Sequence, residues 1–144
     1  MAATLTSLVA LTCLVLLGNL SGHLLLIPPM AASMALVAAA PQLPLAQPRS
    51  VVGGQVVSAL IGIATGLASH SIWAAAVAGA LAVGTTMWLK MPHSPAAATA
   101  VIGTMVTTGQ VSFVICTSVA ACVLVGFGIL SSRLRGASYP LYWL

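Results

Sequence analysis

The sequence predicts an all-α integral membrane protein with six helical segments, two of them short and begun by proline, arranged as two inverted three-helix repeats. The 144 residues contain no Asp or Glu and only four Lys or Arg, whereas a soluble domain draws about a quarter of its residues from these four types. Hydrophobic residues make up 60% of the chain. A stretch near the N-terminus also reappears later in the sequence. The chain therefore has little surface to offer water and belongs in a bilayer.

Four apolar stretches approach or exceed the ~20 residues that cross the hydrocarbon core as a helix: residues 3–27, 51–69, 72–89 and 111–130. Two shorter apolar segments, 30–40 and 96–108, each follow a proline. The first stretch has no basic residue after Met1 and exceeds the length of a signal-peptide core, so we interpret it as a retained helix. With a short tail at 131–144, residues 1–144 form a single transmembrane domain that leaves no room for a soluble one.

An internal repeat groups these segments into two units. Residues 17–33 align without a gap on residues 83–99, which places Gly18 on Gly84, Pro29 on Pro95 and Ser33 on Thr99. The units are residues 3–69 and 72–130. Three crossings in each unit make the second unit inverted relative to the first, and inverted repeats usually place a transport site at their interface.

The four basic residues test this topology. With six crossings, Arg49, Lys90, Arg133 and Arg135 all fall on the side of the N-terminus, whereas four crossings would divide them between the two sides. The positive-inside rule therefore favours six crossings with both termini cytoplasmic, and we expect the bacterial inner membrane. Segment 30–40 reaches only about 16 Å as a helix, so whether it spans or re-enters stays open.

Small residues recur every fourth position on two segments: Gly54, Ser58, Gly62, Gly66 and His70 on one, and Ser118, Cys122 and Gly126 on the other. We expect the first stripe to pack against another helix, because small residues let backbones approach where lipid supplies little hydrophobic drive. One copy has little protein with which to enclose a wet path, so a homo-oligomer is expected. The three cysteines form no C-x-x-C pattern and are interpreted as apolar packing residues.

The starts of the two short segments are candidates for binding an anion. Pro29 and Pro95 open them, and the small residues Ala31, Ser33, Ala97 and Thr99 follow. A helix start with accessible backbone N–H groups is an anion site. The alternative interpretation is two proline-capped helices that begin at the membrane surface.

Two side chains near these starts could assist. His93 precedes the second start and could donate to an anion or move a proton, or it could only cap the helix or face headgroups. Arg49 has no acidic side chain to pair with. Its partner would be a lipid phosphate, a backbone carbonyl, the C-terminal carboxylate or a transported anion.

Two blocks of sequence carry a family resemblance. Residues 44–55, Pro-Leu-Ala-Gln-Pro-Arg-Ser-Val-Val-Gly-Gly-Gln, and residues 93–100, His-Ser-Pro-Ala-Ala-Ala-Thr-Ala, resemble the HPP family of small integral membrane proteins over roughly residues 26–130. Some plant and cyanobacterial members are described as nitrite transporters, so the resemblance implies transport of a small anion. Two positions depart from the family pattern: Ser94 replaces the middle proline of the name-giving motif, and Gln55 stands where many members have His.

We therefore expect a membrane transporter or channel for a small monovalent anion, nitrite first, with a non-transporting membrane subunit or assembly scaffold as the alternative. The candidate binding residues are His93, Ser94, Pro95, Ala97, Thr99, Pro29, Ala31, Ser33, Arg49, Gly53, Gly54 and Gln55. An enzyme is not expected, because the chain has no His-Glu-x-x-His, acidic dyad or Gly-x-Ser-x-Gly elbow. The expected partners are the lipid bilayer and the anion, with no cofactor, metal or nucleic acid.

Overall fold

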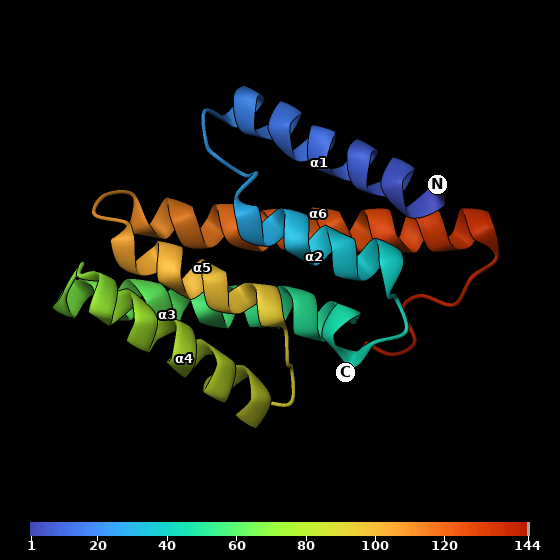
Figure 1. Ribbon diagram of the computed structural model, residues 1–144. Helices are drawn as coiled ribbons and strands as arrows, with labels where there is room; N and C mark the ends of the chain where they lie inside the picture. Colours follow the sequence, from blue (N-terminus) through green and yellow to red (C-terminus); the bar gives the residue numbers. More distant parts are fainter. Residues whose placement is uncertain (144) are drawn as a thin grey trace.

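The computed structural model describes residues 1–143, and over these residues it contains six α-helices and no strand (Figure 1). The helices are α1 (Ala2–Ser21), α2 (Pro28–Ala39), α3 (Gly54–Ala68), α4 (Ile72–Trp88), α5 (Ser94–Met105) and α6 (Gln110–Arg135). A 3₁₀ turn, η1 (Pro44–Ala46), and a π-helical turn, η2 (Arg49–Gly53), connect α2 to α3, and η2 continues directly into α3. The predicted all-helical fold with six segments is confirmed.

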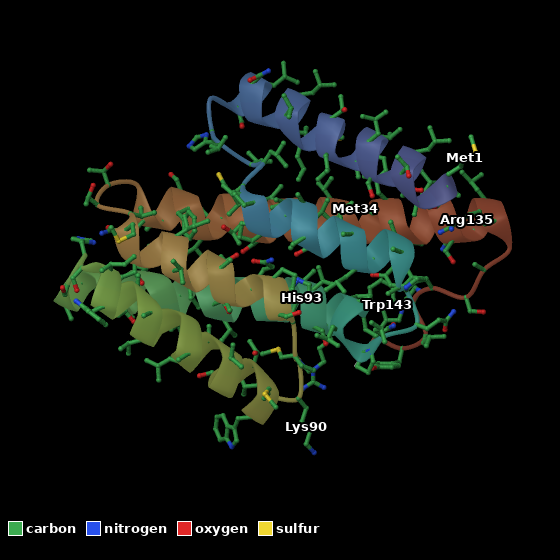
Figure 2. All side chains as sticks on the ribbon, in the orientation of Figure 1. Met1, Met34, Lys90, His93, Arg135 and Trp143 are labelled. Carbon is green, nitrogen blue, oxygen red and sulfur yellow. The ribbon has the colours of Figure 1, made fainter. Side chains whose placement is uncertain are left out.

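Successive helices run in opposite directions, so the two chain ends lie towards the same end of the molecule (Figure 1). Within residues 1–143, three helical stretches are long and apolar enough to cross a membrane: Ala2–Ser21, Arg49–Ala68 and Gln110–Arg135. Helices α2 and α4 are shorter apolar helices. In Figure 2, Met1, Arg135 and Trp143 lie towards the same end of the molecule, while the six crossings and the cytoplasmic termini stay predictions. The inverted symmetry of the two units stays a prediction.

Two helix ends differ from the sequence prediction because glycines adopt the left-handed conformation. The first helix ends at Ser21 rather than at residue 27, since Gly22 has φ 69° and its N–H bonds to the Gly18 carbonyl. The last helix continues to Arg135 rather than ending at residue 130, and Gly136 terminates it with φ 63°. The tail therefore begins near residue 136, not at 131.

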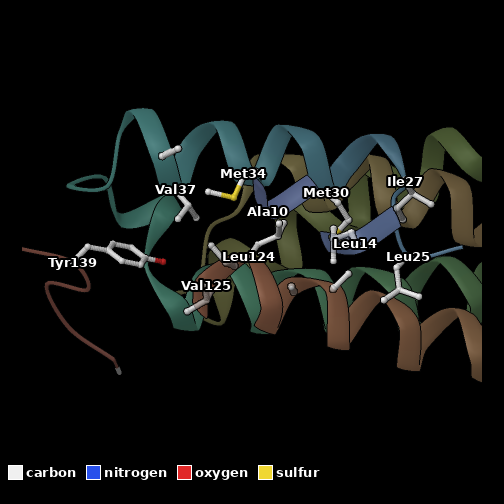
Figure 3. Close-up of a cluster of buried hydrophobic side chains, with 14 residues drawn as sticks. Ala10, Leu14, Leu25, Ile27, Met30, Met34, Val37, Leu124, Val125 and Tyr139 are labelled. Carbon is white, nitrogen blue, oxygen red and sulfur yellow. The ribbon is translucent and has the colours of Figure 1, made fainter. Parts of the chain in front are cut away.

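Helices α1, α2 and α6 share a core of large apolar side chains (Figure 3). Leu14 of α1, Met30 and Met34 of α2, and Leu124 of α6 are fully buried. Burying a side chain of this size away from water contributes about 1.5–3 kcal/mol where water is the alternative. In the membrane, the close packing of these side chains is what holds α1 and α2 on α6.

Helices α3, α4 and α5 pack instead through small residues. A Cβ added at Gly62 of α3 would lie 3.0 Å from the Cα of Ala100 on α5, and one at Gly66 would lie 2.8 Å from the Thr104 carbonyl oxygen. This confirms the prediction that the Gly54-to-Gly66 stripe packs on another helix. The second stripe differs, since Cys122 and Gly126 of α6 are exposed.

The C-terminal tail returns to the proline-rich connection between α2 and α3. The Tyr139 hydroxyl donates to the buried Ala46 carbonyl at 2.8 Å, and the Leu141 N–H donates to Gln47 Oε1 at 2.9 Å. The buried Gln47 amide also donates to the Pro41 carbonyl at 2.8 Å. Burial raises the pKa of the Tyr139 phenol above its ordinary value, so the hydroxyl keeps its proton for this bond. The tail thereby fixes the connection that leads into η2.

Candidate functional site

Four buried polar side chains form a continuous hydrogen-bonded chain where α2, α3 and α5 meet. The Thr99 hydroxyl donates to Gln55 Oε1 at 2.5 Å, Gln55 Nε2 donates to Ser33 Oγ at 2.9 Å, and Ser33 Oγ lies 2.8 Å from His93 Nε2. We call Ser33, Gln55, His93 and Thr99 the polar network. Ser33, Gln55 and Thr99 have no exposed surface, and His93 is 3% exposed. All four are among the residues selected from the sequence.

Hydrogen bonds fix the orientation of the His93 ring. Its Nδ1 lies 2.7 Å from the Leu45 carbonyl oxygen, which can only accept, so Nδ1 carries a proton. In the neutral ring, Nε2 then accepts from Ser33. The Ser33 hydroxyl also lies 2.8 Å from the Pro29 carbonyl, so its single proton has two alternative acceptors. His93 therefore faces the protein interior and not the headgroups (Figure 2).

Gly53 and Gly54 have no side chain, and the connection between α4 and α5 packs directly against them. A Cβ at Gly54 would lie 2.7 Å from His93 Cβ, and one at Gly53 would lie 2.5 Å from Met91 Sδ. Real Cβ atoms do not approach this closely. The two glycines thus allow His93 to reach the network from the start of α5.

The two proline helix starts offer fewer backbone donors than the sequence suggested. Both Pro29 and Pro95 are buried and carry no N–H. The next N–H groups turn back to the residue before each helix: Met30 donates to the Ile27 carbonyl at 2.8 Å, and Ala96 to the His93 carbonyl at 3.0 Å. The expectation of several free N–H groups at each start is corrected by these bonds.

The remaining candidates lie outside the polar network. Ala31 and Ser94 are exposed and Ala97 is half-buried. The Arg49 side chain is exposed, and its Nη2 donates to the Leu89 carbonyl at 3.1 Å at the end of α4. Arg49 is thus held at the protein surface.

Two features beside the network were not assigned to a binding site from the sequence. Ser58 Oγ is fully buried and has no hydrogen-bond partner among residues 1–143. It lies three residues after Gln55 on the same face of α3, and the sequence assigned it only to the small-residue packing stripe. A cavity of about 140 Å³ lies beside His93 and is lined by Leu45, Val83, Thr86, Met87, Pro92, His93 and Ser94. The residues that line this cavity are distant in sequence, so no local sequence pattern predicts it.

A helical chain with membrane-crossing segments and a buried polar network has the features of a multi-pass integral membrane protein. The sequence-family model described as HPP, transmembrane region, matches residues 1–140 of the chain. The chain belongs to the HPP transmembrane family.

A transmembrane protein of Dictyostelium discoideum is 33% identical over 123 residues, which cover 78% of this chain and 40% of that protein. The chain therefore spans about two fifths of the length of this relative. No solved structure matches the chain.

Proposed function

We propose that this protein is a transporter or channel for a small monovalent anion, with nitrite as the first candidate and the polar network as its binding site. The observation that carries the proposal is a chain of four buried polar side chains that links both short helices in a membrane chain with 60% hydrophobic residues. Polar groups inside a membrane protein are costly and commonly mark substrate or ion pathways.

The network suits an anion chemically. The Gln55 amide and the Ser33 and Thr99 hydroxyls supply N–H and O–H donors, and His93 Nε2 becomes a further donor when the ring is protonated. No carboxylate side chain exists in the chain to repel the ligand. The unpartnered Ser58 hydroxyl adds a further donor one turn along α3. The cavity beside His93 provides an approach to the network from the α4–α5 connection.

The same residues connect the two repeat units. Ser33 on α2 and Thr99 on α5 occupy equivalent positions in the 66-residue repeat, and both bond to the Gln55 carboxamide. Sites at the interface of repeats are the usual arrangement in transporters. Rocking of one unit against the other would then break and remake these bonds.

The competing function is a non-transporting membrane subunit or scaffold. Two observations favour it. The four network side chains are hydrogen-bonded to one another, which suits a purely structural link. The exposed small residues Cys122 and Gly126 leave a helical strip of α6 on which a partner helix could pack closely. In this reading, the helical strip would contact another polypeptide of the membrane.

Nitrite uptake into liposomes that contain only this chain separates the two functions. Thr99→Val keeps the shape of the side chain but removes its bond to Gln55, and we expect uptake to fall about tenfold. Thr104→Val is the matched control, because Thr104 is equally buried on α5 and donates only to the Ala100 carbonyl of its own helix.

The control should retain the parent rate. A parent chain that passes no more nitrite than empty liposomes would exclude independent transport. Equal uptake by the parent and Thr99→Val would place the site elsewhere.

A further inference from the structure

None of the basic side chains has an acidic side chain of the same chain to pair with. The sequence contains four basic residues and no Asp or Glu. Arg49 and Lys90 are both exposed. Basic residues near a membrane surface attract anionic lipids, by about fivefold in affinity for each Lys or Arg.

The fold brings two of these cations to one corner. The Arg49 guanidinium donates to the carbonyl of Leu89, the residue next to Lys90, although the two basic residues are far apart in sequence. The bond to Leu89 occupies one N–H of Arg49, and the others remain available in a planar fork that matches a phosphate. Lys90 extends away from the helices at this corner (Figure 2).

The backbone at Lys90 is unusual. Lys90 has φ 56°, the only positive φ of a non-glycine residue within residues 1–143. Its N–H donates to the Met87 carbonyl at 3.0 Å, and the Met91 N–H donates to the Thr86 carbonyl at 2.9 Å. This pair of bonds is a Schellman motif, in which the left-handed position is normally glycine. Lysine at a position suited to glycine indicates a use for its charge.

Tryptophans place this corner at the level of the headgroups. Trp88, directly before Leu89, is 81% exposed, and Trp73 at the opposite end of α4 is also 81% exposed. Exposed tryptophans at both ends of an apolar helix mark the two membrane interfaces. Met87 is 65% exposed beside Trp88, so apolar surface adjoins the two cations on the bilayer side.

We propose that Arg49, Lys90 and Trp88 form a binding site for the phosphate headgroup of an anionic phospholipid. The two cations contact the phosphate, while Trp88 and Met87 contact the glycerol and the upper acyl chain. A soluble anion would gain nothing from these exposed apolar side chains, which favours the lipid as occupant. The inference is independent of anion transport.

Native mass spectrometry of the detergent-solubilised full chain, titrated with phosphatidylglycerol or phosphatidylcholine, tests the site. The parent should retain phosphatidylglycerol in preference. Lys90→Gly and Arg49→Gln should each weaken that binding about fivefold, the amount expected for one basic residue near a membrane surface. Arg133→Gln, at the end of α6, is the matched control and should bind as the parent does.

Lys90→Gly also guards against misfolding, because glycine is preferred at this backbone position. Its lipid-free melting temperature should equal or exceed that of the parent. Three results would overturn the proposal: undiminished lipid binding by both corner variants, an equal loss in Arg133→Gln, or displacement of the lipid by an equal concentration of inorganic phosphate.

Discussion

Replacement of Gly62 by alanine should force α3 and α5 apart. The added Cβ would lie 3.0 Å from both the Cα and the carbonyl carbon of Ala100, and closer still to its oxygen. Carbon atoms in good contact are about 3.5–4.0 Å apart, so the two backbones must separate by roughly 0.5–1 Å. Because the obstacle is backbone, no side-chain rotation relieves it.

The expected net effect of Gly62→Ala is destabilisation of about 1 kcal/mol, within a range of roughly 0–2.5 kcal/mol. Overpacking of this kind costs about 1–3 kcal/mol, and replacing glycine inside a helix returns roughly 0.5–1 kcal/mol. Separation of α3 from α5 also stretches the 2.5 Å bond from Thr99 to Gln55. Gly62→Ala should therefore reduce nitrite uptake along with stability.

The measurement is the free energy of unfolding in a single detergent, compared with Gly84→Ala. A Cβ at Gly84 of α4 meets no atom of the described chain within 4 Å, so this control should match the parent or gain up to about 1 kcal/mol. The reasoning is refuted if Gly62→Ala and Gly84→Ala unfold alike, since the tight backbone contact would then carry no energetic weight.

Three further outcomes are expected. In a background without the native cysteines, Ala2→Cys and Trp143→Cys should be labelled from the same face of the membrane, and labelling from opposite faces would exclude six crossings. Tyr139→Phe leaves the buried Ala46 carbonyl without its donor, so the free energy of unfolding should fall by about 1–3 kcal/mol. Proteases should then release the tail sooner, and an unchanged digestion pattern would show that this bond does not hold the tail. Ser58→Ala removes a buried unpartnered hydroxyl and should raise stability by about 1 kcal/mol while lowering nitrite uptake, and unchanged uptake would remove Ser58 from the site.

The number and order of the helices along the chain were largely predictable, because they depend on composition and on local features such as proline and glycine. Apolar segments bounded by proline and glycine gave six segments in the right order. The ends at Ser21 and Arg135 were not predicted, because Gly22 and Gly136 each could have continued or ended a helix. Only the observed left-handed φ angles decide between these outcomes.

The members of the polar network were among the residues selected from the sequence, but their geometry was not predictable. Ser33, Thr99 and His93 were selected for their places at the proline helix starts, and Gln55 for its place in the family block. Their mutual hydrogen bonds depend on how closely α3 approaches α5, which is set by backbone contacts at Gly62 and other small residues. No local pattern encodes that distance, and for the same reason the sequence left the partner of Arg49 open among four alternatives, of which the structure shows the backbone carbonyl, that of Leu89.

The hydrogen bonds of Gln55 show why a neutral carboxamide suits the position between Ser33 and Thr99. Ser33 accepts a hydrogen bond from Gln55 and Thr99 donates one to it, so the bridging side chain needs a donor at one atom and an acceptor at another. A carboxamide meets both needs, as does a neutral imidazole. A carboxylate could accept from Thr99 but could not donate to Ser33, and it would repel an anion. The chain contains no acidic side chain, and at the centre of the polar network it carries a residue that supplies both a donor and an acceptor without charge.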